Sequence, residues 1–219
     1  MDYIDPSASE QAKQYIIGIT FLSVKKNNYV YKIKNLKVHA LNNLPIYNTE
    51  QTAEEIKTQY LFESAGEKII IKAIEYTPIA NMGGRTVYNL GFGDYDEALG
   101  TIVDDINSNN GDIYIVFNTV LSTVPTFFSL NEDAVIIVSG SDSHDDFIND
   151  CLPTCKKKCV EHCKNYQRRI KTYRYYVDKN FEELSVDYIF FGRNKSKANT
   201  FVQYIPKHEY DDILVYKKK

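Results

Sequence analysis

The sequence predicts an α+β fold: a mainly antiparallel sheet, a central buried helix, and a two-helix segment before three C-terminal strands. Two observations predict this class. Segments of alternating apolar and polar residues stand in pairs at both ends of the chain. Between them lie one long segment with helical apolar spacing and one short, continuous apolar run. The 219 residues suffice for one sizeable core, so one domain with additions is expected.

The first half of the chain is predicted to consist mostly of strands. Residues 15–24 and 29–40 have the pattern of a hairpin. A short charged helix is expected from capping residues at 48–51 up to about Gln59. Residues 68–76 and 85–92 then alternate as antiparallel partners, across a loop that contains Gly83 and Gly84.

The second half is predicted to contain the helices and three further strands. The central helix should begin after Asp112 and run to about Phe127, with Pro125 as a local interruption. Residues 134–139 form an apolar run that is typical of a strand buried on both faces. Two helices, separated at Pro153, are expected within residues 143–177. The closing strands are expected at residues 186–191, 200–205 and 213–216.

Composition and charge exclude several classes of protein. The net charge of −3 excludes a globally basic nucleic-acid binder, so a nucleic acid would need a local basic patch. The sequence has no apolar run of about 18–20 residues and starts without a cationic leader. We therefore expect a soluble, cytoplasmic protein that does not enter a membrane. Four cysteines in such a chain are expected to be free thiols or metal ligands.

Residues 88–94 and 109–112 hold the densest concentration of Gly, Asn and Asp in the chain, and both segments end in Gly-Asp. These residue types tolerate unusual backbone angles and bond to nearby amides, so the Gly-Asp pair at the end of each segment is predicted to form a turn. Neither has the spacing of a phosphate loop, a metal loop or a nucleophile elbow. They therefore predict local structure rather than a reaction.

Four blocks of residues carry a resemblance to a known family. The first comprises residues 62–64, Gly66 and 69–72, and the second is the segment 88–94. The third comprises residues 104–105, 109–112 and the helix residues that follow. The fourth comprises residues 140–141, 169–173, 180–184, 191–192 and 210–217. Together they resemble a domain of unknown function found in small bacterial proteins of the Bacteroidetes type, over roughly residues 59–217.

The resemblance implies a division of the chain. Residues 1–58 are predicted to form an N-terminal hairpin extension, and residues 59–219 the family α+β domain. The chain departs from the family pattern by a helical insertion at about residues 142–167, which carries all four cysteines. It also has Lys171 where the family has Arg, and Lys lacks the planar fork that binds an anion through two parallel hydrogen bonds.

The residues of these motifs suggest a binding cleft. Each group of residues also has an explanation in terms of structure alone. The aspartates have the chemistry of a cation site or a general base, but turns and helix caps use the same residues. The helix at 166–176 interleaves cations with tyrosines, as nucleic-acid-binding surfaces do, but an ordinary surface helix has this composition too. The candidate cleft residues are Asn89, Asp94, Asn110, Asp112, Ser141, Arg169, Lys171 and Tyr173.

The four cysteines, at positions 151, 155, 159 and 163, fall at four-residue intervals. On one helix they would form a drifting stripe, and Pro153 leaves the last three on the same helix. The zinc candidates are Cys155, Cys159, Cys163 and His162. One straight helix cannot surround an ion tetrahedrally, so a packed thiol stripe is favoured over zinc, and no cofactor is expected.

These observations favour a cytosolic interaction module with unknown activity over an enzyme. A protein partner or self-association is expected, and nucleic acid is a second candidate partner, through residues 166–176. The kind of family that the chain resembles implies a bacterial conflict system, such as toxin–antitoxin or phage defence. The alternative is a small enzyme that acts on nucleic acid or a nucleotide, with Asp94 or Asp112 as base or metal ligand and Arg169, Lys171 and Tyr173 on phosphate.

Overall fold

The computed structural model describes residues 44–53, 57–103, 110–144, 146–154, 158–159, 163–195 and 200–219. The hairpin predicted at residues 15–40 lies outside these ranges. The chain divides into two compact units. The first comprises the residues up to 73 together with 94–126, and the second comprises 74–93 together with 127–219.

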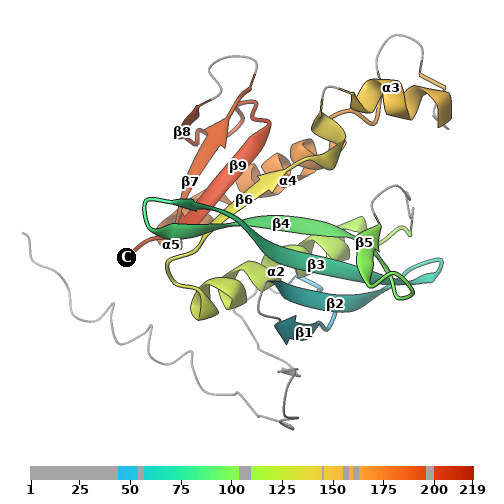
Figure 1. Cartoon of the computed structure of the whole chain (residues 1–219), viewed down its shortest axis with the longest axis horizontal. Coiled ribbons are helices and arrows are strands. Elements are labelled where there is room, and N and C mark those ends of the chain that lie inside the picture. The colour runs from blue at the N-terminus through green and yellow to red at the C-terminus, as the bar shows by residue number, and fades with distance from the viewer. Residues whose placement is uncertain are drawn as a thin grey trace, which may run out of the picture. The chain divides into compact units, whose positions relative to one another are not determined.

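The described residues confirm the predicted α+β class, with a mostly antiparallel sheet (Figure 1). Nine strands pair in the order β1-β2-β3-β4-β6-β9-β7-β8, and β5 pairs with β4 off this path. The strands are β1 Glu50–Ala53, β2 Thr58–Ala65, β3 Ile69–Met82, β4 Arg85–Asp96, β5 Thr101–Val103, β6 Val135–Ser139, β7 Tyr188–Arg193, β8 Phe201–Gln203 and β9 Asp212–Lys217. The helices are α2 Ile113–Leu130, α3 Phe147–Cys151, α4 Arg168–Lys179 and α5 Phe181–Asp187, with short 3-10 turns η3 Ser141–Ser143 and η4 Leu152–Thr154.

The charged helix predicted up to about Gln59 is wrong. Strand β1 pairs antiparallel with β2, and Gln51 lies opposite Tyr60. Gln51, Gln59 and Tyr60 are buried, so this segment gains more from pairing and burial than its helix-capping residues offer.

The β3–β4 hairpin is longer than predicted, because its turn contains only Gly83 and Gly84. Both have positive φ, 58° and 79°, as two-residue hairpin turns require. Strand β4 also continues to Asp96, since its last three residues pair with β5. Gly93 and Asp94 therefore lie within a strand, and the turn predicted there is wrong. Gly111 does occupy a turn, with φ of 76°.

The predicted central helix is confirmed as α2, which continues through Pro125 to Leu130. By length and composition alone, α2 could span a membrane. However, Val120, Phe127 and Phe128 on this helix are at most 1% exposed. Such burial is typical of the core helix of a folded domain, in which one side of the helix packs on the protein interior.

Aromatic side chains dominate the core of the second unit. Tyr76 of β3 stacks on Phe127 at 4.0 Å between ring centroids, and Tyr88 of β4 meets the same ring edge-on at 5.0 Å. Strand β6 is buried, as predicted for residues 134–139. It runs parallel to β4 and antiparallel to β9. Helix α4 packs against β6, which fixes the position of α4 within this unit (Figure 1).

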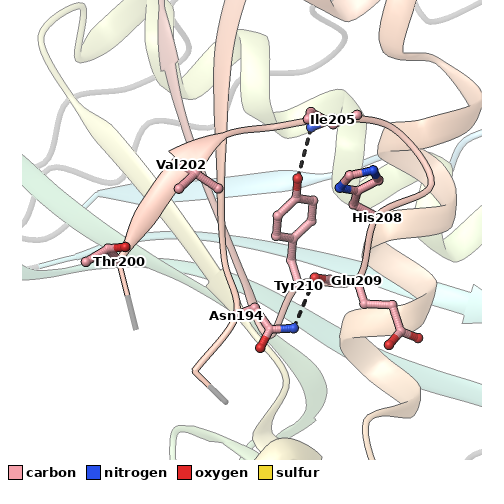
Figure 2. A pocket seen from close by; sticks show the side chains of 7 residues that line it. All are labelled: Asn194, Thr200, Val202, Ile205, His208, Glu209 and Tyr210. Carbon is pink, nitrogen blue, oxygen red and sulfur yellow. Dashed lines mark hydrogen bonds between the residues drawn. The ribbon is translucent and has the colours of Figure 1, made fainter. Parts of the chain in front are cut away.

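Gly192 of β7 allows an aromatic ring to lie directly on the sheet. A Cβ at this position would stand 2.2 Å from the ring of Tyr210, so no other residue fits beside that ring without moving it. The Tyr210 hydroxyl accepts a hydrogen bond of 3.0 Å from the Ile205 amide, which ties the segment after β8 to the ring (Figure 2).

Two differences concern the helical segment before the last strands. Two helices, α3 and α4, occupy the predicted range, but α5 was not predicted. The helix expected to carry the last three cysteines is wrong for the two of them that are described: Cys159 and Cys163 are not helical. Lys158 has a φ of 48°, which does not fit a right-handed helix. Cys155 and His162 lie outside the described residues.

Candidate functional site

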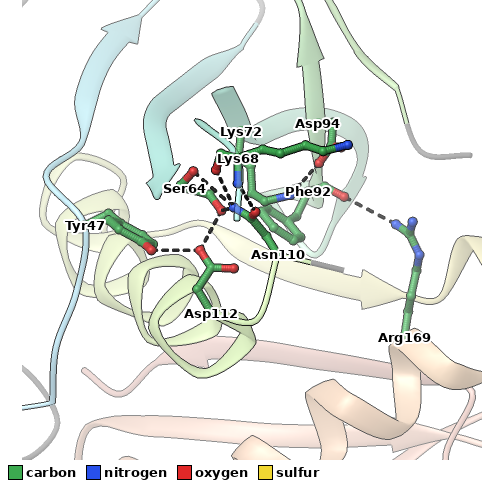
Figure 3. A network of polar contacts seen from close by, with 9 residues as sticks. All are labelled: Tyr47, Ser64, Lys68, Lys72, Phe92, Asp94, Asn110, Asp112 and Arg169. Carbon is green, nitrogen blue, oxygen red and sulfur yellow. Dashed lines mark hydrogen bonds and ion pairs between the residues drawn. The ribbon is translucent and has the colours of Figure 1, made fainter. Parts of the chain in front are cut away.

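A buried amide organises the polar network of the first unit (Figure 3). Asn110 is 5% exposed. Its Oδ1 accepts a hydrogen bond from the Lys68 amide at 2.9 Å, and its Nδ2 donates to the Lys68 carbonyl at 2.9 Å and to Ser64 Oγ at 2.8 Å. One side chain thereby holds the turn between β2 and β3.

Gly66 lies in that turn because the backbone of Asn110 passes too close for any side chain. A Cβ on Gly66 would stand 1.8 Å from the Asn110 carbonyl oxygen, which is far inside a van der Waals contact. The predicted first and third sequence blocks therefore meet at this point.

Asp112 stands at the start of helix α2, and its carboxylate accepts hydrogen bonds from two hydroxyl groups. Its carbonyl accepts the Val116 amide at 3.1 Å, which is a first-turn helix bond. Its Oδ2 accepts hydrogen bonds from Tyr47 OH at 2.7 Å and Ser64 Oγ at 2.5 Å. Burial, followed by the hydrogen bond to the Asp112 carboxylate, raises the pKa of Tyr47. The Asp112 carboxylate is thus part of an internal network.

Asp94 of β4 forms an ion pair with Lys72 of β3, also within the first unit. The Lys72 side chain is 5% exposed and that of Asp94 17%. A buried ammonium group needs a close anion, and Asp94 supplies it. Asp104, Asp105 and Asn109, which sequence reasoning grouped with these carboxylates, lie outside the described residues.

At the Gly140–Ser141 turn of the second unit, a side chain of the protein supplies a buried negative charge. Asp142, 5% exposed, accepts the Arg169 amide on its Oδ2 at 2.9 Å. This bond caps the first turn of α4, where amides lack helical partners. The Asp142 carbonyl also accepts the Gln167 amide at 2.9 Å. Sequence reasoning missed Asp142.

The remaining candidate residues of the second unit occupy different environments. Arg169 Nη1 donates to the Phe92 carbonyl at 3.4 Å, as Figure 3 also shows. Lys171 is exposed, whereas Tyr173 is buried on the inner side of α4. Asn89 is half-buried in β4, opposite Ile137 of β6. Asp94, Asn110 and Asp112 belong to the first unit, and the other five candidates to the second.

Asp212 is a second buried carboxylate that sequence reasoning did not select. It is fully buried and accepts Ser139 Oγ at 2.5 Å and Arg193 Nε at 2.7 Å, and Lys195 Nζ lies 3.6 Å from it. The available signal was weak: an Asp-Asp pair directly before an apolar strand. Its partners come from β6, from β7 and from the segment after β7, so the carboxylate joins three parts of this unit.

The outer side of α4 carries a row of exposed cations around a tyrosine. In a helix with 3.6 residues per turn, the positions three, seven and eleven residues after a given residue fall on the same side as that residue. Arg168, Lys171, Tyr175 and Lys179 have this spacing and are all exposed. Among the described residues, no ion pair engages these three cations. We call these four residues the α4 basic stripe.

The described cysteines do not gather into a metal site. Cys151, Cys159 and Cys163 are half-buried. The Lys164 amide donates to Cys159 Sγ at 3.3 Å, and Asn165 Nδ2 donates to Cys151 Sγ at 3.5 Å. Within the part of the chain that the structure describes, no three His, Cys, Asp or Glu side chains are grouped as metal ligands are. The zinc hypothesis stays a prediction, because two of its four ligands are not described.

Comparison with known proteins concerns just under half of the chain. Residues 43–146 match a family of unknown function (DUF6934). The match contains the whole Asn110 network and segment 88–94, and it ends before α4. It starts within the predicted N-terminal extension, and the predicted boundary at residue 58 stays a prediction. Neither a curated protein nor a solved structure matches the chain.

Proposed function

We propose that this chain is a soluble binding module that grips a single-stranded nucleic acid through the α4 basic stripe. The observation that carries the proposal is the composition of the stripe. Three exposed cations run beside one exposed tyrosine over about 16 Å, given the 1.5 Å rise per helical residue. A row of cations can follow a phosphate backbone, and an exposed aromatic ring between them can stack on a base.

The position of these cations at the start of α4 supports a role in binding rather than in stabilising the fold. The first turn of α4 contains Arg168 and Arg169 and no acidic residue. Cations are unfavourable at a helix N-terminus, by roughly 0.3–1 kcal/mol each, because the helix dipole is positive there. Asp142 offsets part of this cost. Local stability therefore does not explain Arg168, which points to solvent, whereas attraction to an external polyanion does.

The enzyme alternative receives less support from the motif aspartates. Asp94 neutralises Lys72, and Asp112 accepts two hydroxyl groups. A general base or a metal ligand needs lone pairs that face the substrate or the ion. Asp94 could act that way only by giving up its ion pair, and one oxygen of Asp112 already accepts hydrogen bonds from two hydroxyl groups. The cytoplasmic location and the role in a bacterial conflict system belong to this proposal by analogy with the resembling family.

Neutralising the stripe tests the function. The probe is a fluorescein-labelled, mixed-sequence 20-nucleotide RNA, and binding is followed by anisotropy at about 50 mM salt. We expect Arg168→Ala with Lys171→Ala to weaken binding about tenfold or more and to reduce the salt slope by about 1.4, since each phosphate contact on a single strand contributes about 0.7.

The matched control is Lys68→Ala with Lys219→Ala, which removes two exposed cations from other elements. This variant should bind nearly as the unmodified chain does. If both double variants lose the same affinity, or if the unmodified chain does not bind the RNA, the proposed function is wrong. Binding of poly-glutamate with equal affinity would indicate an acidic protein as the partner instead.

A further inference from the structure

The second unit contains a pocket of about 380 Å³ beside β8 (Figure 2). This volume lies at the small end of the range of about 300–1,000 Å³ that is typical of small-molecule sites. Its walls include Asn194, Val202, Ile205, His208, Glu209 and Tyr210. Tyr210 forms the buried part, and its ring lies against Gly192.

The walls of the pocket combine apolar surface with a few polar groups. Val202 is 49% exposed and Ile205 50%, so both offer apolar surface that a flat ligand would cover. His208 is an exposed ring at the rim, as Figure 2 shows, and provides a stacking surface. The Tyr210 hydroxyl accepts the Ile205 amide, which leaves its own hydrogen to donate. The Glu209 carboxylate lies at the edge of the pocket, on the side of helix α4, and its oxygens can accept hydrogen bonds.

One ion pair connects this pocket to helix α4. Arg174 Nη2 lies 4.0 Å from Glu209 Oε1, and Arg174 follows Lys171 of the α4 basic stripe by three residues. Residues three apart are neighbours on a helix surface. This ion pair links the edge of the pocket to the helix that carries the stripe, within the same unit.

We infer that the pocket holds one unpaired nucleobase with an amino group on its pairing edge, from the strand whose phosphates lie on the α4 basic stripe; this inference rests on the proposed function. The half-exposed apolar walls and the histidine ring suit the faces of a base. Single-stranded nucleic acids are commonly recognised in this way, through stacking together with hydrogen bonds to the base edges.

The charge of Glu209 decides which part of a nucleotide enters. A carboxylate repels phosphate, but it accepts hydrogen bonds from an exocyclic amine, as in the contacts that acidic side chains make with cytosine N4. Guanine, cytosine and adenine carry such an amine, and uracil does not. The pocket should therefore prefer these three bases over uracil, while the stripe binds phosphates of any sequence.

Labelled 12-nucleotide RNAs test this preference. Each consists of uridines with one central position changed to guanosine, cytidine, adenosine or an abasic site. With the unmodified chain, at least one amino-bearing base should raise the affinity about tenfold over uridine, since a good base contact discriminates by about 1–3 kcal/mol. The abasic oligonucleotide should bind no better than oligouridine.

Two variants separate this inference from the proposed function. Glu209→Ala removes both acceptor oxygens and should abolish the preference without lowering the affinity for oligouridine, whereas Glu182→Ala, which removes an exposed carboxylate from α5, should leave the preference intact. Arg168→Ala with Lys171→Ala should weaken the binding of all five RNAs and keep the preference. Equal binding of all five RNAs, or a preference that survives Glu209→Ala, would contradict the pocket inference without contradicting the proposed function of the stripe. If no RNA binds, both proposals are wrong.

Discussion

Asp94 and Asp112 show how motif carboxylates can hold a fold together. Asp94 pairs with a lysine that is almost fully buried, and Asp112 joins the start of α2 to Ser64 and Tyr47. Removing one partner of a buried ion pair leaves an uncompensated charge, which costs more than removing both partners. This difference can be measured.

Asp94→Ala should destabilise the fold by about 3–5 kcal/mol, because the Lys72 ammonium group then stays buried after losing the Asp94 carboxylate. The double variant Lys72→Met with Asp94→Leu should recover most of that loss, since it replaces the pair with apolar groups. The free energy of unfolding in urea, measured for each variant, checks both expectations.

Glu97→Ala is the control for this cycle, because Glu97 is exposed in the same part of the chain. It should change stability by no more than about 0.5 kcal/mol. A double variant as unstable as Asp94→Ala alone would show that the ion pair is not what makes Asp94 important.

Individual site residues were predicted only where the sequence marks them locally. Asn110 and Asp112 stand in a Gly-Asp segment, and their positions at a turn and a helix start follow from their residue types. Asp142 and Asp212 have no such mark. Asp212 bonds to Ser139, 73 residues earlier, and Asp142 to Arg169, 27 residues later. The importance of such carboxylates depends on contacts that form only in the folded chain.

At the scale of elements, helix α4 depends on a cap from outside its own segment. Gln167 precedes the helix in a left-handed conformation and makes no side-chain capping bond. Asp142 of η3 supplies the acceptor instead. The cap also places a negative charge at the positive end of the helix dipole, close to two arginines.

Asp142→Ala should therefore destabilise the protein by about 1–2 kcal/mol, the usual cost of losing a helix cap. In the Asp142→Ala variant, the first backbone amides of α4 should also exchange their hydrogens with solvent faster than the backbone amides of α2 in the same protein. Urea unfolding and hydrogen exchange measure the two effects.

Asp146→Ala is the matched control. Asp146 precedes α3 and is exposed, and its side chain makes no capping hydrogen bond. Its removal should cost no more than about 0.5 kcal/mol. Equal losses in the two variants would show that the Asp142 carboxylate does not cap α4.

Helices and strands with a strong apolar pattern were predicted correctly, and those with a weak pattern were not. Helix α2 and strand β6 have long or uniform apolar patterns, and both were predicted. Strand β1 was mistaken for the start of a helix because Thr and Glu near it resemble a cap, whereas pairing with β2 determines its structure. Helix α5 was missed because it is short and separated from α4 only by Asn180.

The whole molecule contains several buried phenols, which determine its behaviour at high pH. Burial raises the pKa of Tyr188 to about 12, with Asp187 adding to the effect, and it also raises those of Tyr60 and Tyr204. In the unfolded chain these groups ionise near pH 10. Their contribution to stability is therefore complete below pH 10 and is lost as the pH rises towards 12.

We expect the free energy of unfolding to fall between pH 10 and 12, and Tyr188→Phe to make that fall shallower. Urea unfolding at several pH values measures the slope, and absorbance at 295 nm follows phenolate formation. Tyr114→Phe is the control, because Tyr114 is 67% exposed and should leave the slope unchanged. Equal slopes in all three proteins would contradict the assignment to Tyr188.

At the scale of the whole chain, the apolar patterns predicted the fold class but not the surface that the fold presents. The net charge is negative, yet α4 collects three cations on one exposed side. The basic-aromatic character of residues 166–176 was visible in the sequence. Which tyrosines face inward was not: Tyr173 and Tyr176 are buried, and Tyr175 alone of these three is exposed.

The contact between Gly192 and the Tyr210 ring gives a way to read related sequences. Any side chain at position 192 would displace the ring, so glycine at that position and tyrosine at 210 should change together. Both positions lie beyond the segment 43–146 that matches the family. Relatives can therefore share the Asn110 network and differ at this pair, and those with a larger residue in place of Gly192 should lack both the pocket and its selectivity among bases.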